Sequence, residues 1–170
     1  LQPAAARDWR RMRAAAAADG VTLQLVSAFR HAAYQTRLFE RKLARGATIE
    51  QILGVNAAPG YSEHHSGRAI DVTTPGCAPA EEAFEDTDAF AWLQRNAARH
   101  GFRLSYPRGN PHGVVYEPWH WYHVGVDGKH VRISADVLPL PRGNVEVLAA
   151  QAQHVGCPRR RVIGEGEPDA

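Results

Sequence analysis

The chain has 170 residues, of which 44% are hydrophobic, with 20 Lys and Arg side chains against 18 Asp and Glu. This size and composition can bury a core as one globular domain, which excludes collagenous, coiled-coil and disordered classes. The formal net charge of +2 is spread along the chain, so no cationic face for nucleic acid is expected. Apolar runs stay well short of the roughly 20 residues that a transmembrane helix needs.

The first part of the chain alternates between helical and extended patterns. Trp9, Met12 and Ala16 recur at helical spacing in a segment rich in alanine and arginine, and Gly20 follows as a stop signal. Branched residues then alternate over a short stretch, as in a strand. The elements predicted here are helices at residues 3–18, 32–45 and 49–53 and a strand at residues 21–26.

Further extended and helical patterns follow, and the last 30 or so residues are rich in Pro, Gly and Arg. Pro118 marks an irregularity in the last extended run. Residues 1–138 are expected to form the domain and residues 139–170 a C-terminal extension. Cys77 and Cys157 are candidates for a disulfide between the two. The elements predicted are strands ending at residue 72 and at 102–106 and 114–124, and a helix at 84–100.

A zinc site is one interpretation of the histidines and carboxylates. His64 and Asp71 are seven residues apart where a turn passes into a strand, so both side chains can reach one point. Both residue types bind zinc, and a hydrolytic zinc site uses three protein ligands. The aromatic run offers His120 or His123 as the third ligand, and Glu117 as a carboxylate for general-base catalysis.

The same residues have interpretations that involve no function. The chain holds nine histidines, so a His–Asp pair at this spacing is unremarkable. His64 can be an ordinary loop residue, Asp71 a turn carboxylate and Glu117 a solvated strand residue. Arg30, at a predicted strand end, can be a surface cation. Spacing alone leaves these alternatives open.

Three motifs follow one another along the chain. They are Ser27-Ala-Phe-Arg30 with Tyr34-Gln35, then Ser62-x-His64-x-x-Gly67-x-Ala69-x-Asp71, and about 45 residues later Glu117-Pro-Trp-His120-Trp121. In this order they resemble the signature of the zinc D-alanyl-D-alanine carboxypeptidases of the VanY type. The resemblance spans roughly residues 20–125, and three motifs together are more specific than any one alone.

The resemblance implies a role for each residue of the motifs. It implies one zinc ion per chain, held by His64, Asp71 and His120, with Glu117 as the catalytic base. Arg30 is then expected to hold the substrate carbonyl oxygen and its developing negative charge.

Other residues are expected to support this site. Ser62 and Gln35 are expected to grip the terminal carboxylate and backbone of the substrate. Gly67 and Ala69 are expected to be small because the backbone approaches the metal loop closely. His123, across the strand from His120, is expected to lie outside the ligand set or to be structural.

The implied architecture is an α+β fold of the hedgehog/DD-peptidase-like zinc type, with a small, mostly antiparallel sheet flanked by helices. The implied activity is removal of the terminal D-alanine from peptidoglycan stem peptides, in the periplasm or outside the bacterial cell. The alternatives are an L,D-carboxypeptidase or an endopeptidase acting on the same stems. Another class of alternative is a zinc-containing module that binds the cell wall without catalysis.

Overall fold

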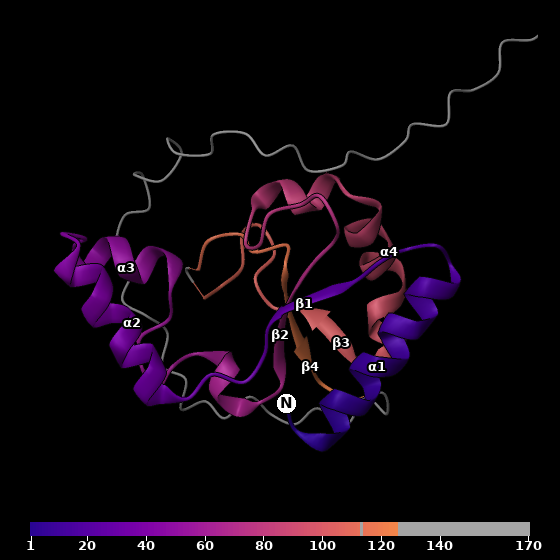
Figure 1. Ribbon diagram of the computed structural model, residues 1–170, viewed down its shortest axis with the longest axis horizontal. Helices are drawn as coiled ribbons and strands as arrows, with labels where there is room; N and C mark the ends of the chain where they lie inside the picture. The colour runs from indigo at the N-terminus through magenta and orange to yellow at the C-terminus, as the bar shows by residue number, and fades with distance from the viewer. Residues whose placement is uncertain (113, 126–170) are drawn as a thin grey trace, which may run out of the picture.

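The computed structural model describes residues 1–112 and 114–125 (Figure 1). Within these ranges the chain forms a four-stranded sheet with helices on both sides of it. No helix in this part of the chain is long and apolar enough to cross a membrane. The predicted domain boundary at residue 138, the extension at 139–170 and Cys157 lie outside the described residues.

The sheet confirms the predicted α+β fold. Its strands are β1 (Gln24–Ser27), β2 (Ala69–Thr73), β3 (Phe102–Leu104) and β4 (His120–His123). They are ordered β1-β2-β4-β3, and each neighbouring pair is antiparallel. The register of the edge strand β1 shifts between Leu25 and Ser27, as at a β-bulge. Because a bulge bends a strand, the chain turns here just before the loop that carries Arg30.

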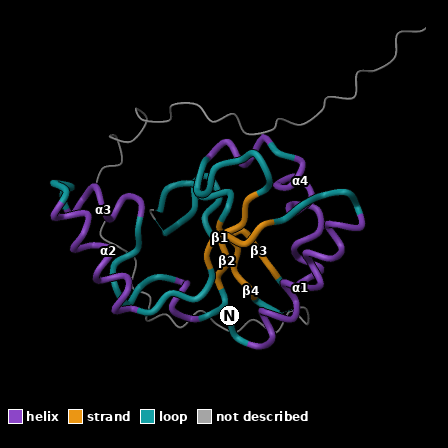
Figure 2. Tube along the Cα trace, viewed as in Figure 1, coloured by secondary structure: helices purple, strands orange, loops and turns teal. Residues whose placement is uncertain are grey.

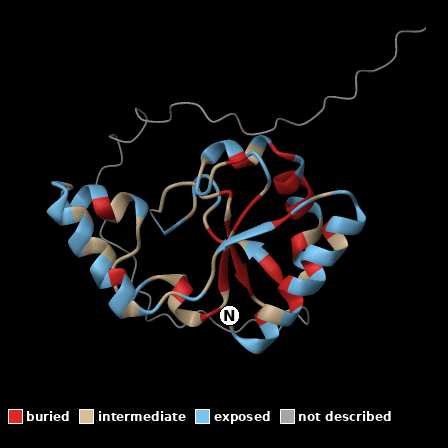
Figure 3. Cartoon of the chain, in the orientation of Figure 1, coloured by how far each residue is buried: buried red, intermediate tan, exposed pale blue. Residues whose placement is uncertain are grey.

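The core lies on the face of the sheet that α1 (Pro3–Ala18) and α4 (Asp88–Asn96) cover. Figure 3 shows buried residues gathered on the strands and on the inner sides of these two helices. Met12 of α1, Leu93 of α4 and Ile70 of β2 are fully buried in one cluster. Burying such a side chain stabilises the fold by about 1.5–3 kcal/mol. The helix predicted at residues 3–18 is confirmed, with Pro3 in its first turn.

Two further helices, α2 (Ala32–Ala44) and α3 (Ile49–Val55), lie on the other side of the molecule from α1 (Figure 1). Figure 2 shows loops joining this pair to the sheet. A capping box between Thr48 and Gln51 starts α3. Within α2 and α3, the buried residues are only Gln35 and Ile52. The pair therefore buries few side chains, and Gln35 connects it to the loop before α2 by accepting a hydrogen bond from Arg30.

The single helix predicted for residues 84–100 is wrong. The structure has two 3₁₀-helices, η2 (Glu82–Asp86) and η3 (Ala97–His100), on either side of α4. Thr87 separates η2 from α4, because its backbone is extended and its hydroxyl accepts a hydrogen bond from Phe90 N at 3.1 Å. A threonine in this position starts a new helix. The apolar residues of this segment recur as they would on one long helix, because all three short helices face the same core.

The strand predicted for residues 114–124 is also shorter than expected, because only His120–His123 is a strand within the described residues. The backbone N–H of His120 donates to the Glu117 carbonyl at 3.1 Å, which closes a turn that contains Pro118. Proline lacks an N–H and has a fixed φ, so it suits a turn better than a strand interior. Glu117 therefore comes from a turn and not from a distorted strand.

Alternation along β4 sends neighbouring side chains to opposite faces of the sheet. Trp121 and His123 both face the core side. His123 Nε2 lies 3.0 Å from Asp8 Oδ2 of α1, and both side chains are 3% exposed. The His123 ring also packs against Phe102, with ring centroids 5.0 Å apart. His123 thus ties β4 to α1.

Replacing His123 by alanine is expected to lower the free energy of unfolding by about 3 kcal/mol, because Asp8 then stays buried without its imidazole partner. Urea denaturation followed by circular dichroism measures the change. Asp8→Asn keeps a hydrogen-bonding side chain at that position and should cost less. An unfolding midpoint in His123→Ala equal to that of the wild type would contradict this role.

Candidate metal centre

Three side chains from separate elements meet on the face of β2 and β4 opposite to His123. His64 lies in the 3₁₀-helix η1 (Glu63–Ser66), Asp71 in β2 and His120 in β4. Two imidazole nitrogens and a carboxylate oxygen lie within 4.8 Å of one another. Within residues 1–112 and 114–125, no other group of three His, Cys, Asp or Glu side chains converges in this way.

The strand register places two of these residues together. Asp71 and His120 are direct partners across the antiparallel β2–β4 pair, where opposite Cβ atoms lie about 4.5–5.5 Å apart. His64 is brought in by η1, which ends at Gly67 with φ of 68°. A glycine adopts this left-handed conformation without strain, and an added Cβ would lie 3.3 Å from Gln2 N. The close neighbour of Gly67 is therefore the N-terminal segment, and not the metal loop as predicted.

The orientation of the His64 ring is fixed by a hydrogen bond at Nδ1, the nitrogen that faces away from Asp71. Its Nδ1 lies 2.6 Å from the carbonyl oxygen of Ala28, which can only accept a hydrogen bond. The proton of a neutral ring is therefore on Nδ1, and Nε2 carries the lone pair. Nε2 lies 3.1 Å from Asp71 Oδ2, which places this lone pair at the point of convergence.

The ring of His120 lies between two carboxylates. Its Nδ1 is 2.9 Å from Asp71 Oδ1, and its Nε2 is 2.9 Å from Glu63 Oε2. Burial alone would lower the pKa of His120, but its hydrogen bonds to Asp71 and Glu63 raise the pKa to about 10. In the absence of another cation, the ring is therefore protonated and supplies the positive charge that these carboxylates need.

The donor set fits a zinc ion. Two imidazoles and one carboxylate are the kind of three-ligand set that hydrolytic zinc sites use. Burial alone would raise the pKa of Asp71, but the hydrogen bond from the protonated His120 holds it below its usual value. Asp71 is therefore ionised, and a divalent cation can replace the proton on His120 Nδ1 as the neutralising charge.

Glu117 lies on the same side of the cluster as His120 Nδ1. Its Oε2 is 3.8 Å from that nitrogen, and 14% of its side chain is exposed. Burial raises the pKa of Glu117 to about 7. A carboxyl group with this pKa both accepts and donates a proton near neutral pH, as a general base that later acts as an acid must.

Arg30 reaches the cluster from the loop between β1 and α2. Its Nη2 lies 4.0 Å from Asp71 Oδ2, and 22% of its side chain is exposed. The backbone N–H of Arg30 donates to the His64 carbonyl at 3.2 Å, and its carbonyl accepts from His65 Nδ1. These two hydrogen bonds connect the loop to η1 and fix the position of Arg30 relative to His64.

The two residues predicted to bind substrate also have contacts within the protein. Gln35 is fully buried, accepts a hydrogen bond from Arg30 Nη1 at 3.0 Å and donates one to the Ala57 carbonyl at 2.7 Å. Ser62 caps η1 by accepting a hydrogen bond from His64 N at 3.3 Å. Gln35 thus supports Arg30, and Ser62 supports His64. Direct contact of either with substrate stays a prediction.

Sequence reasoning missed three residues that surround His120. They are Glu63, Ser105 and Tyr106, whose ring centroid lies 4.9 Å from that of His120. Burial raises the pKa of Tyr106, so its hydroxyl stays protonated. Glu63 directly precedes the predicted ligand His64, and this position in the sequence could have marked Glu63 as a candidate site residue. Nothing in the spacing of Ser105 and Tyr106 connects them to the site.

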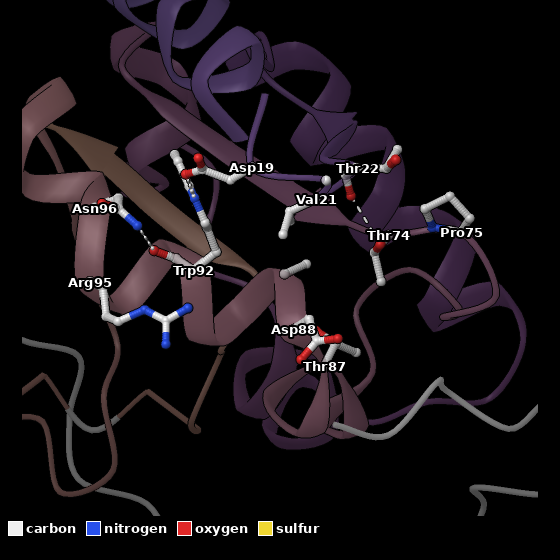
Figure 4. A pocket seen from close by; sticks show the side chains of 12 residues that line it. Asp19, Val21, Thr22, Thr74, Pro75, Thr87, Asp88, Trp92, Arg95 and Asn96 are labelled. Carbon is white, nitrogen blue, oxygen red and sulfur yellow. Dashed lines mark hydrogen bonds between the residues drawn. The ribbon is translucent and has the colours of Figure 1, made fainter. Parts of the chain in front are cut away.

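A separate hollow of about 670 Å³ opens between the end of α1 and α4 (Figure 4). Trp92 and Asp19 lie in its wall, where Trp92 Nε1 donates to Asp19 Oδ2 at 2.7 Å. Its lining includes none of the converging residues described above. The hollow is therefore not part of the metal centre.

Comparison with known protein families gives a match over most of the chain. The family described as VanY, D-alanyl-D-alanine carboxypeptidase, matches residues 1–126. A D-alanyl-D-alanine carboxypeptidase of Enterococcus faecalis is 32% identical over 123 residues. That alignment covers 66% of this chain and 44% of the relative, so the chain spans less than half the length of that protein.

Solved structures give the same picture of the fold. The LdcB LD-carboxypeptidase superposes with a TM-score of 0.68 at 32% identity, covering 74% of this chain and 60% of that one. The vancomycin resistance D,D-pentapeptidase VanY of a VanB-type cassette, solved as a mutant with Zn(II), superposes with a TM-score of 0.61 at 29% identity. This superposition covers 75% of the present chain and 74% of the D,D-pentapeptidase chain.

Metal content distinguishes the two candidate histidines of β4. His120→Ala is expected to lose stoichiometric zinc, because one of the three candidate ligand atoms is removed. His123→Ala is the matched control and should retain zinc under conditions in which it is folded, because its ring faces Asp8. Elemental analysis of the two purified variants after dialysis checks this. Loss of zinc from His123→Ala and its retention by His120→Ala would reassign the third ligand.

Proposed function

The chain belongs to the VanY family of D-alanyl-D-alanine carboxypeptidases, and from this premise we propose that it is a zinc-dependent D,D-carboxypeptidase. Its substrate is the peptidoglycan stem peptide that ends in D-Ala-D-Ala, and it removes the last residue. The observation that carries the proposal is the convergence of His64, Asp71 and His120, with Glu117 beside them. The Zn(II) bound to the related D,D-pentapeptidase supports the choice of metal.

His64, Asp71 and His120 hold the zinc ion in this proposal. When bound there, zinc supplies Lewis-acid chemistry that polarises a carbonyl group and lowers the pKa of water. The three ligand atoms come from one turn and two paired strands, so they are largely placed before the metal binds. This preorganisation favours a fixed position for the scissile peptide.

Glu117 moves the proton. Its carboxylate takes a proton from the attacking water and delivers it to the amine nitrogen of the terminal D-alanine as the C–N bond breaks. The new carboxylate remains on the shortened stem, so atoms and charge balance. The raised pKa of Glu117, about 7, matches both halves of this transfer.

Arg30 stabilises the negative charge that develops on the carbonyl oxygen. A guanidinium group suits this task because it stays charged and presents planar donors. Gln35 and the hydrogen bonds of the loop backbone hold Arg30 in place. Ser62 and Gln35 are also proposed to contact the terminal carboxylate of the substrate.

We propose a catalytic domain at residues 1–138 and an extension at residues 139–170; the family match at residues 1–126 supports the first part of this division. The substrate class places the activity at the bacterial cell envelope, in the periplasm or outside the cell. An L,D-carboxypeptidase is a second candidate, because the LdcB enzyme superposes with the higher TM-score of the two structures compared. A zinc module without catalysis is disfavoured because both Glu117 and Arg30 lie beside the ligands.

Incubation of the zinc-loaded protein with tripeptide, tetrapeptide and pentapeptide stems tests the activity. We expect free D-alanine from the pentapeptide alone, with loss of release after chelation and recovery on adding zinc. Mass spectrometry identifies the products. Release from the tetrapeptide instead would establish the L,D activity, internal cleavage an endopeptidase, and no cleavage by zinc-loaded protein a binding module.

Glu117→Gln is expected to bind zinc as the wild type does but to lose at least about 100-fold in kcat, because the amide cannot take up the proton. Zinc content and stem-peptide hydrolysis, measured on the same preparation, separate binding from turnover. Hydrolysis at the wild-type rate in this variant would reject Glu117 as the base.

A further inference from the structure

Glu63 has no part in the chemistry proposed above, yet it lies directly against a proposed ligand. Its Oε2 is 2.9 Å from His120 Nε2, and 14% of its side chain is exposed. The Glu63 carboxylate therefore faces the side of the imidazole away from Asp71.

The two nitrogens of His120 have different neighbours. Nδ1 faces Asp71 and Glu117, while Nε2 faces Glu63. A neutral imidazole has one N–H donor and one lone pair. An acceptor at Nε2 holds the proton there, so the lone pair of Nδ1 is left pointing at the metal centre.

Ser105 fixes the carboxylate of Glu63 in turn. Its hydroxyl donates to Glu63 Oε2 at 2.6 Å, and its backbone N–H donates to the His120 carbonyl at 3.3 Å. Ser105 itself is buried, with 5% of its surface exposed. The segment after β3 thus connects the backbone of His120 to the carboxylate that orients its ring.

His64 has a weaker version of the same arrangement. The partner of its Nδ1 is the backbone carbonyl oxygen of Ala28, whereas the partner of His120 Nε2 is a carboxylate oxygen of Glu63. A carboxylate behind a ligand histidine fixes its tautomer and makes its lone pair more basic. His120 is therefore the ligand that depends more strongly on its supporting residue.

We propose that Glu63, held by Ser105, is a positioning residue that presents His120 to the metal through Nδ1. The inference rests on the proposed function, since it concerns the same zinc site. The alternative is a purely structural ion pair that stabilises the fold and has no effect on the metal. A positioning role predicts that loss of Glu63 lowers the zinc affinity by more than the loss of folding stability explains. A structural ion pair predicts a loss of stability alone.

Zinc affinity, measured by competition with a chromogenic chelator, tests the proposal. Glu63→Ala should bind zinc about 10–100-fold more weakly than the wild type, the usual cost of losing such a partner. Glu63→Gln keeps an acceptor without the charge and should fall between the two. Ser105→Ala should weaken binding by a smaller factor, because Glu63 is still present. Glu40→Gln, an exposed change on α2, is the matched control and should bind within twofold of the wild type.

Urea denaturation of each variant in chelator measures the structural contribution separately. If Glu63→Ala does not fold, Glu63→Gln and Ser105→Ala carry the test. NMR of ¹⁵N-histidine in the zinc-loaded wild type should show His120 protonated at Nε2 and metal-bound at Nδ1.

Zinc affinity within twofold of the wild type in all three variants, or metal at Nε2, would overturn the positioning role. If this occurred while the wild type bound zinc and hydrolysed stems, only this inference would fail. A wild type that bound no zinc would overturn the proposed function as well.

Discussion

The antiparallel register of β2 with β4 is the constraint on which the site depends. It places Asp71 directly opposite His120, and both strands are anchored by core residues on their other face, such as Ile70 and Trp121. A shift of one residue would turn these core residues toward the metal side and the ligands into the core. The burial of the core therefore also selects the register that assembles the metal centre. Stability and function are coupled at this strand pair.

Charge balance is the second constraint. Glu63, Asp71 and Glu117 surround one imidazole, and the pKa values of His120 and Asp71 shift in opposite directions because each needs the other's charge. Such a cluster costs free energy unless a cation compensates it. A proton on His120 does so in the absence of metal, and a divalent ion does so more fully. The distribution of acids around the centre therefore favours a cation independently of any motif.

Much of this arrangement can be predicted from the sequence, because local patterns determine it. The helix at Pro3–Ala18 follows from composition and spacing, and the antiparallel sheet was expected. The break at Thr87 was missed, because three short helices facing one core mimic the period of one long helix. Glu63 and Ser105 were missed for another reason. Their link exists only after β3 pairs with β4, and no local pattern records a contact between residues 42 positions apart.

The two sides of the molecule contribute differently to the proposed reaction. The proposed metal ligands are held by the buried strands and by η1, whereas Arg30 belongs to a loop that leads into the sparsely buried α2 and α3 pair. Gln35 and His65 fasten this loop, so the orientation of Arg30 depends on a few hydrogen bonds and little apolar burial. Elements with few buried contacts are those that open or shift most easily. Changes in how the proposed substrate is accepted can therefore arise on the α2 and α3 side, while the register of β2 and β4 keeps the candidate metal centre unchanged.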